Sequence, residues 1–288
     1  EVSNYKYNSK GGSGKASNIF EIPMPDEFRG KYRGKRAGKK YFIEFEKIIS
    51  KAKKANKKIS AMIVEPIISC GGQIELPEKF LKKCKKILDK ENILLIVDEV
   101  QTGFGRVGEK FWGFQLHDVI PDIVTLGKPM GNGHPIGAVV CTTEISKKFD
   151  NGLEFFSSFG GNPVSCRIAN EVIREIDSRN LQKNALKTGK FLVSELKKLA
   201  KKYSIIGNVR GRGLFIGLEL VDQNLIPEMN KAIYLVNRMK ELGVLMSNDG
   251  LDKNVIKIKP PIIFSIDDSK RLIMLLDKVM AEDYMQLN

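Results

Sequence analysis

The amino-acid sequence predicts an α/β fold, with a mostly parallel sheet sandwiched by helices and a smaller C-terminal α+β domain. Runs of Ile, Val and Leu without polar alternation, at 93–97 and 123–126, are typical of strands buried on both faces, and such strands belong to parallel sheets covered by helices. Helical apolar spacing alternates with these runs, which indicates βαβ units. We place the domain boundary within a long helical stretch at 163–203, so that residues 1–165 form the first domain and residues 166–288 the second.

The expected elements follow in chain order. The first domain should contain a helix at 41–54, a strand at 59–64, a helix that has Pro77 in its first turn and ends near 90, the two strands above, a strand at 138–142 and a short helix at 144–149. A long helical pattern should then begin after Pro163, and a second, strongly amphipathic helix should run from about 181 to 203. The second domain should contain a hairpin-like strand pair at 205–209 and 214–220, a helix at 230–242, strands at 243–246 and 255–258, and a closing helix at 267–280.

Composition excludes several classes of protein. The net charge of +14 comes from 48 Lys and Arg against 34 Asp and Glu, and lysine runs such as 51–58 are interleaved with apolar residues at helical spacing. These charges indicate the solvent faces of amphipathic helices; a nucleic-acid groove is the alternative, but no aromatic interleaving accompanies them. No apolar run reaches membrane-spanning length. Four widely spaced cysteines predict no metal site and a soluble protein of a reducing compartment, the cytoplasm or the mitochondrion.

A carboxylate and a lysine follow the two central strands. Asp98 comes directly after the first run, and Lys128 follows the second run and Gly127. In open α/β sheets the ligand binds at the carboxyl ends of the strands. A carboxylate suits a protonated ring nitrogen and an amine suits a carbonyl carbon, so the pair predicts pyridoxal 5'-phosphate as cofactor.

The motifs resemble those of class III, fold type I, pyridoxal-phosphate-dependent aminotransferases. They are PDEFRGKYR at 25–33, VEPIISCGGQI at 64–74, VDEVQTGFGRVG at 97–108, PDIVTLGKPMGNGHP at 121–135, FGGNPVSC at 159–166 and KIKPP at 257–261. Within that class the sequence is most similar to the alanine-glyoxylate aminotransferase 2-like branch of ethanolamine-phosphate and phosphohydroxylysine phospho-lyases. The resemblance implies a homodimer whose site is shared between subunits. It also implies that residues 1–165 are the C-terminal part of a large cofactor-binding domain, preceded in relatives by the turn that holds the cofactor phosphate.

The resemblance assigns roles to individual residues. Lys128 matches the Schiff-base lysine, which also moves the Cα proton, and Asp98 matches the partner of the pyridine nitrogen. Gln101 matches a residue that hydrogen-bonds the phenolic oxygen of the cofactor. Ser158 stands where relatives have a threonine that reaches the cofactor phosphate of the partner subunit. The structural alternatives are a solvated loop lysine for Lys128, a strand-end cap for Asp98 and a loop surface for Gln101.

The substrate-binding positions depart from the aminotransferase pattern. Relatives that accept 2-oxo acids commonly carry a second glutamate five residues after Glu65, and it gates an arginine that binds the substrate carboxylate. Here Cys70 and Lys257 occupy these two places. Lysine offers a point charge where arginine offers a planar fork, so the amino-acid clamp is absent. Lys259, two residues along the strand, is expected on the same face as Lys257.

These departures favour a lyase that eliminates phosphate from a phosphorylated amine such as phosphoethanolamine and gives an aldehyde, ammonia and phosphate. The first alternative is a transaminase of ω-amino or alanine-glyoxylate type, which shares the cofactor residues. The second is a truncated, inactive copy that retains only the fold. The sequence predicts a small-molecule substrate, with no nucleic acid or membrane as partner.

Overall fold

The computed structural model describes residues 2–8 and 10–287. The chain folds as two compact units, residues 1–59 and residues 60–288. The predicted boundary within 163–203 concerns a different division and stays a prediction. Among the helices that the structure describes, none is long and apolar enough to cross a membrane.

The first unit contains α1 (Asn4–Tyr7) and α2 (Ala37–Lys54), which begins four residues earlier than the sequence predicts. The buried residues Tyr41, Phe45 and Ile49 recur at four-residue spacing and form the apolar stripe of α2. The Tyr41 hydroxyl donates a hydrogen bond to the Asp26 carbonyl oxygen at 2.9 Å. This contact ties the PDEFRGKYR motif to α2, so the motif has a structural role within its own unit.

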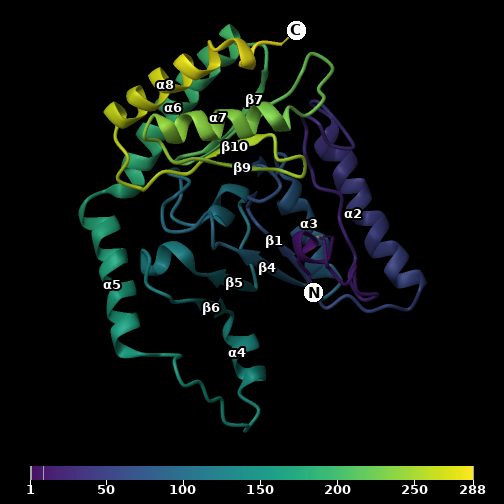
Figure 1. Cartoon of the computed structure of the whole chain (residues 1–288). Helices are drawn as coiled ribbons and strands as arrows, with labels where there is room; N and C mark the ends of the chain where they lie inside the picture. The colour runs from purple at the N-terminus through teal and green to yellow at the C-terminus, as the bar shows by residue number, and fades with distance from the viewer. Residues whose placement is uncertain (1, 9, 288) are drawn as a thin grey trace. The chain divides into compact units, whose positions relative to one another are not determined.

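The second unit begins with a four-stranded sheet in the order β1-β4-β5-β6 (Figure 1). Its strands are β1 (Ala61–Val64), β4 (Leu94–Asp98), β5 (Ile123–Leu126) and β6 (Ala138–Cys141). The first three are parallel, and β6 pairs antiparallel with β5. The mostly parallel sheet that the sequence predicts is therefore confirmed, and the carboxyl ends of β1, β4 and β5 meet at one edge.

One helix boundary in the second unit differs clearly from the prediction, and backbone conformation explains it. The helix α3 (Phe80–Lys90) begins three residues after Pro77, because Lys79 adopts the left-handed conformation at φ 62° and ends the preceding turn. The stretch 163–203 contains two helices, as the sequence predicts, and they are α5 (Pro163–Ser178) and α6 (Leu181–Lys202). Between them Asn180 is left-handed at φ 51°, a conformation that asparagine tolerates better than most residues.

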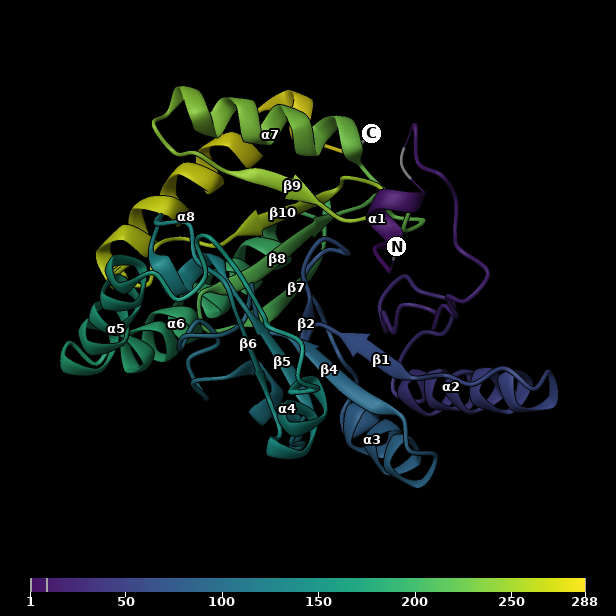
Figure 2. The ribbon, with the colours of Figure 1, turned by 90° about the horizontal axis from the view of Figure 1, so that it is seen from below.

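The second sheet of this unit is antiparallel, with the order β7-β8-β10-β9 that Figure 2 shows. Its strands are β7 (Ile206–Arg212), β8 (Phe215–Leu220), β9 (Ser247–Asp249) and β10 (Val255–Ile258), and the helices α7 (Met229–Glu241) and α8 (Ile266–Met280) accompany α6 on one face. Leu218, Ile256 and Ile258 point into the core beneath these helices. Because side chains alternate along a strand, Lys257 faces the opposite side.

The predicted strand at 243–246 is wrong. Gly243 takes a positive φ of 81° just after α7, and the Val244 amide donates to the Met239 carbonyl oxygen at 2.8 Å. These contacts close the end of the helix, so strand pairing begins only at Ser247, opposite Lys257. The residues that cap α7 therefore shift the start of this strand from the predicted position 243 to Ser247.

Short elements complete the unit. The helix α4 (Thr143–Phe149) lies where the sequence predicts it, and the 3-10 turns are η1 (Gly113–His117), η2 (Lys128–Gly131) and η3 (Asp283–Met285). A small hairpin, β2 (Ile67–Ile68) with β3 (Ile74–Glu75), was not predicted, because two-residue strands carry no periodic signal. It contacts the second sheet: Arg210 Nε donates to the Gly72 carbonyl oxygen at 2.8 Å, and Arg212 Nε lies 2.6 Å from Glu75 Oε2.

Candidate active site

Two adjacent parallel strands deliver the predicted carboxylate and lysine to the same edge. Asp98 is the last residue of β4, and it pairs in register with Thr125 of β5. Lys128 follows β5 after one glycine and begins η2, with an exposed side chain and a left-handed φ of 32°. The edge that the sequence predicts as the ligand site thus carries an accessible amine beside a half-buried carboxylate.

Only one oxygen of the Asp98 carboxylate forms a hydrogen bond with the residues that the structure describes. Oδ1 accepts a hydrogen bond from the Val100 amide at 2.9 Å. Oδ2 makes no hydrogen bond with the residues that the structure describes, so it is available to a donor from a ligand. Beside it in register, the buried Thr125 hydroxyl also lacks a partner among those residues. One oriented, half-free carboxylate fits the protonated ring nitrogen of pyridoxal phosphate.

The neighbouring Glu99 serves a different purpose. Its side chain is fully buried and accepts hydrogen bonds from the Gly113 amide at 2.9 Å, the Phe114 amide at 2.7 Å and the Thr102 hydroxyl at 2.8 Å. Burial raises the pKa of this carboxyl. Glu99 therefore anchors the loop of residues 99–114, which contains Gln101, and it does not face the site edge.

Glu65 lies at the same edge, directly after β1. Its carboxylate accepts hydrogen bonds from the Ser69 amide at 2.9 Å and the Ser69 hydroxyl at 2.5 Å. Burial raises the pKa of Glu65, the Asp98 charge raises it further, and the Lys128 charge lowers it. The charges of Asp98 and Lys128 therefore both lie within electrostatic range of the Glu65 carboxyl.

Lys259 joins this group from the other sheet. Its ammonium donates a hydrogen bond to Gln101 Oε1, although the two residues are 158 positions apart. Burial lowers the pKa of Lys259 to about 7, and the positive charges of Arg106, Lys257 and Lys128 act in the same direction. Arg106 is itself buried, which lowers its pKa to about 10, and it donates to the Pro260 carbonyl oxygen. The sequence did not indicate Arg106, because its partner is a backbone carbonyl remote in the chain.

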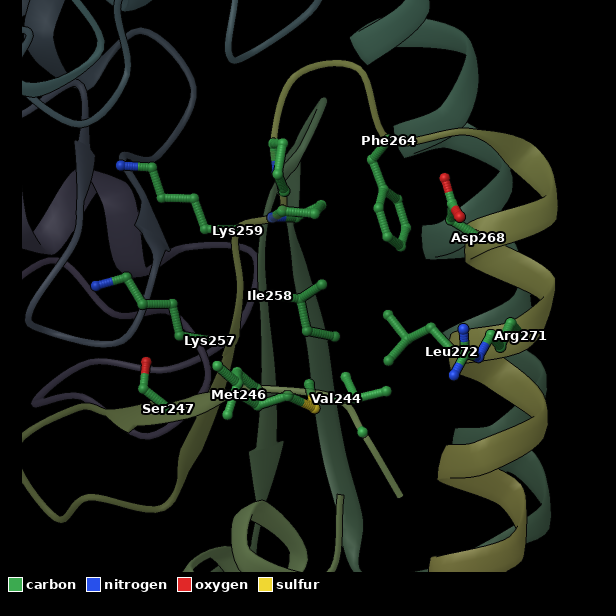
Figure 3. Close-up of a pocket in the computed structure, with 14 residues that line it drawn as sticks. Val244, Met246, Ser247, Lys257, Ile258, Lys259, Phe264, Asp268, Arg271 and Leu272 are labelled. Atoms are coloured by element: carbon green, nitrogen blue, oxygen red, sulfur yellow. The ribbon is translucent and has the colours of Figure 1, made fainter. Parts of the chain in front are cut away.

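Lys257 lies on the same side of the strand as Lys259 (Figure 3). A cavity of about 640 Å³ lies between the second sheet and the start of α8, and Phe264, Arg271 and the two lysines belong to its lining. The ammonium groups of both lysines point away from Phe264 and Arg271, toward the opposite face of the sheet (Figure 3). Lys257 Nζ forms an ion pair of 2.7 Å with Asp249 Oδ2. The same oxygen accepts a hydrogen bond from Gln73 Nε2 at 3.0 Å. The shared face that the alternation predicts is present, but Lys257 already has a carboxylate partner that the sequence did not indicate.

Two of the predicted residues lie apart from this group. Cys70 is exposed in the β2–β3 turn and contributes its carbonyl oxygen to the Gly250 amide at 3.1 Å, while its thiol is not among the groups that line the cavity. Ser158 lies in the exposed segment between α4 and α5. The structure thus brings together Glu65, Asp98, Gln101, Lys128 and Lys257, and it adds Lys259.

Comparisons with known proteins agree with this fold. The family model of class III aminotransferases matches residues 2–280. A protein of Drosophila melanogaster called alanine-glyoxylate aminotransferase 2-like is 43% identical over 283 residues, which are 95% of this chain and 57% of that protein. A Caenorhabditis elegans protein called ethanolamine-phosphate phospho-lyase homolog 1 is 36% identical over 297 residues, which cover 98% of this chain and 64% of that protein.

Among solved structures, an Arthrobacter phospholyase in complex with phosphoethanolamine is 35% identical, with a TM-score of 0.83, and the match covers 85% of this chain and 59% of that one. The chain belongs to the class III aminotransferase family. Pyridoxal phosphate is the cofactor of this family, which confirms the predicted cofactor and the α/β fold. The chain spans about 55 to 65% of the length of the curated relatives that it matches.

Proposed function

We propose that this chain carries the catalytic lysine and the ring-nitrogen carboxylate of a lyase that eliminates phosphate from a phosphorylated amine such as phosphoethanolamine. The observation that carries the proposal is the pair of lysines, Lys257 and Lys259, whose ammonium groups point to the same side of one strand, the side on which Lys259 reaches Gln101. Two amines on one face of a strand suit a phosphate dianion. Loss of phosphate would leave an enamine, and its hydrolysis by one water molecule would give an aldehyde and ammonia beside the inorganic phosphate.

The chemistry divides between two residues of the sheet edge. Lys128 would hold the cofactor through its amine, and the same amine would take the proton from the carbon that bears the substrate amine. Its exposed side chain and its position one residue past the strand end leave the amine free to move between these two tasks. Asp98 keeps a proton on the ring nitrogen, because Oδ1 is fixed by Val100 and Oδ2 remains available. When bound, pyridoxal phosphate supplies an electron-withdrawing ring that stabilises the negative charge left on that carbon.

Gln101 contributes the remaining contact of this chain to the cofactor. Its Oε1 accepts from Lys259, so its Nε2 donors are left for the phenolic oxygen. In this arrangement the Lys259 ammonium would lie between cofactor and substrate. Lys259 therefore links the residues that bind the ring to those that bind the phosphate.

Lysine in place of arginine decides which substrate the cavity prefers. An arginine would bind a carboxylate through two parallel hydrogen bonds, whereas Lys257 presents a compact charge. Phosphate dianion is a good leaving group, and two cations that stabilise it favour its departure over return of the proton. The phosphoethanolamine bound to the 35% identical Arthrobacter phospholyase supports this choice of substrate class.

A transaminase of ω-amino or alanine-glyoxylate type is the second candidate, and the 43% identity to a protein called alanine-glyoxylate aminotransferase 2-like favours it. Lys128, Asp98 and Gln101 would have the same tasks in both enzymes. Their presence favours either activity over an inactive copy that retains only the fold. The two reactions differ in what leaves the substrate, so products distinguish them.

We also propose that the protein acts as a homodimer whose site is shared between subunits. Large apolar side chains are exposed throughout the segment 149–164, and they are Phe149, Leu153, Phe155, Phe156, Phe159 and Val164. An apolar patch of this kind marks an interaction surface. Ser158 lies within the segment and is presented to a partner subunit, where its hydroxyl would reach the cofactor phosphate.

Cys70, Cys141 and Cys166 are free thiols, which suits a reducing compartment, and we propose the cytoplasm or the mitochondrion. The decisive experiment supplies phosphoethanolamine to the full-length protein loaded with pyridoxal phosphate. Release of phosphate and ammonia in equal amounts without a 2-oxo acid supports the lyase. A requirement for a 2-oxo acid, with no phosphate released, would establish the transaminase instead.

A further inference from the structure

Lys257, which the sequence analysis assigns to substrate binding, already forms an ion pair with a carboxylate of the same chain. Lys257 and Asp249 are diagonal neighbours on the β9–β10 pair, where Lys257 stands opposite Ser247 and Asp249 opposite Val255. The distance between Nζ and Oδ2 is 2.7 Å, and 18% of each side chain is exposed. An ion pair this sheltered is screened far less than a surface pair. An incoming anion must therefore compete with Asp249 for Lys257.

The position of Asp249 is fixed from the opposite side by Gln73. The Gln73 amide nitrogen donates to Asp249 Oδ2 at 3.0 Å and to the Ser69 carbonyl oxygen at 2.9 Å. Gln73 is fully buried, and it lies against Gly217, where a Cβ would come within 3.1 Å of the Gln73 side chain. A side chain at position 217 would push Gln73 aside by a few tenths of an ångström, so Gly217 of β8 gives the Gln73 side chain the room that it occupies.

The same loop reaches the sheet edge. Ser69 donates through its amide and its hydroxyl to Glu65, which lies within electrostatic range of Asp98 and Lys128. A continuous series of polar contacts thus runs from Glu65 through Ser69, Gln73 and Asp249 to Lys257. It connects the end of the substrate cavity to the cofactor residues through the β2–β3 turn.

We infer that Asp249 is the gating carboxylate of this site: it pairs with Lys257 until an anion binds and yields Lys257 to the phosphate group of the substrate. The inference rests on the proposed function, because it names the residue that sets which anion that same cavity admits. A dianion outcompetes the single charge of Asp249, whereas a monoanion meets an equal competitor. Asp249 is in this sense a specificity-determining residue, and it acts through Lys257.

The test measures the affinity of the full-length protein, loaded with pyridoxal phosphate, for inorganic phosphate by titration calorimetry at about pH 8, where phosphate is mostly a dianion. Asp249→Asn keeps an acceptor for Gln73 and removes only the competing charge. A gate predicts that phosphate binds this variant about tenfold more tightly, a change of about 1.4 kcal/mol. A residue that merely orients Lys257 predicts the opposite direction, because its loss leaves the amine misplaced.

Two further variants isolate the effect. In a Lys257→Gln background the Asp249→Asn change should have no effect on phosphate affinity, since no cation remains to be released. Asp252→Asn is the matched control, because it removes the same charge from the exposed turn between β9 and β10 and should leave phosphate affinity unchanged. Unchanged or weaker phosphate binding by Asp249→Asn overturns the gate, and so does an equal gain in the Lys257→Gln background.

The outcome is separable from that of the proposed function. Failure of the unaltered enzyme to release phosphate from phosphoethanolamine would overturn the lyase, whatever the variants bind. The gate is judged only on the change in anion affinity between Asp249→Asn and the unaltered protein. Asp249→Ser, which removes the charge with a smaller side chain, must give the same direction of change, and a loss of affinity in both variants counts against the gate.

Discussion

Lys259 and Gln101 are joined by a hydrogen bond across 158 positions of sequence, with the ammonium donating to Gln101 Oε1. Gln101 follows β4 of the parallel sheet, and Lys259 follows β10 of the antiparallel sheet. The contact brings the residues proposed for the cofactor together with those proposed for the substrate. Lys259 is half-buried at this contact, and burial lowers its pKa to about 7.

Anion binding should depend on pH through Lys259. Its pKa is lowered to about 7, first by burial, so the amine is charged below that pH and neutral above it. We expect sulfate, which keeps its two charges throughout, to bind the full-length enzyme about tenfold more tightly near pH 6 than near pH 8. Lys259→Met should remove this dependence, while Lys110→Met on the exposed surface should preserve it. A flat profile in the unaltered enzyme would refute the assignment.

Lys128→Ala should abolish covalent attachment of pyridoxal phosphate and reduce turnover by several orders of magnitude. The reason is that one amine serves both to hold the cofactor and to move the substrate proton. Borohydride reduction followed by peptide mapping identifies the attached lysine in the unaltered protein. Lys147→Ala, which changes an exposed lysine of α4, is the control. Attachment to any lysine other than Lys128 would contradict the prediction.

Asp98→Asn should retain cofactor binding but lose most of the activity. A neutral amide preserves the hydrogen bond from the Val100 amide, yet it cannot hold a proton on the ring nitrogen. We expect kcat to fall by about a hundredfold or more, with a smaller change in cofactor affinity. Asp150→Asn, at an exposed position, is the control, and a kcat equal to that of the unaltered enzyme would assign the ring nitrogen to another residue.

Glu99→Ala should weaken the fold more than it affects the chemistry. Removal of the carboxylate leaves three donors without their acceptor, those of Thr102, Gly113 and Phe114. We expect the free energy of unfolding to fall by about 3 kcal/mol, and Glu99→Gln, which keeps one acceptor, to lower it by less. Urea denaturation measures both. Equal stability of Glu99→Ala and the unaltered protein would mean that water replaces the carboxylate.

Phe156→Glu should weaken self-association. This phenylalanine is 79% exposed in a segment where Phe155 and Phe159 are similarly exposed. Placing a charge in a buried dimer interface should raise the dissociation constant at least about tenfold. Analytical ultracentrifugation detects the change, and Ile120→Glu, at an equally exposed apolar residue outside the segment, is the control. A dimer of unaltered affinity would move the interface elsewhere.

The amino-acid sequence by itself determined the local parts of this protein. Apolar runs predicted β4 and β5, and the residues that follow these runs predicted Asp98 and Lys128 at one sheet edge. Parallel strands bring their carboxyl ends together whatever the rest of the chain does, so local pattern was sufficient there. Alternation likewise placed Lys257 and Lys259 on one face of β10.

Only the tertiary structure decided the partners of these side chains. That Lys257 pairs with Asp249, that Gln73 holds Asp249 from 176 positions away, and that Lys259 reaches Gln101 all depend on how the β2–β3 turn and the parallel sheet meet the antiparallel sheet. Periodicity reports which way a side chain points but not what lies opposite it. The group that each cation contacts is supplied by such distant parts of the chain, and for that reason the pairing of Lys257 with Asp249 could not be predicted from the sequence.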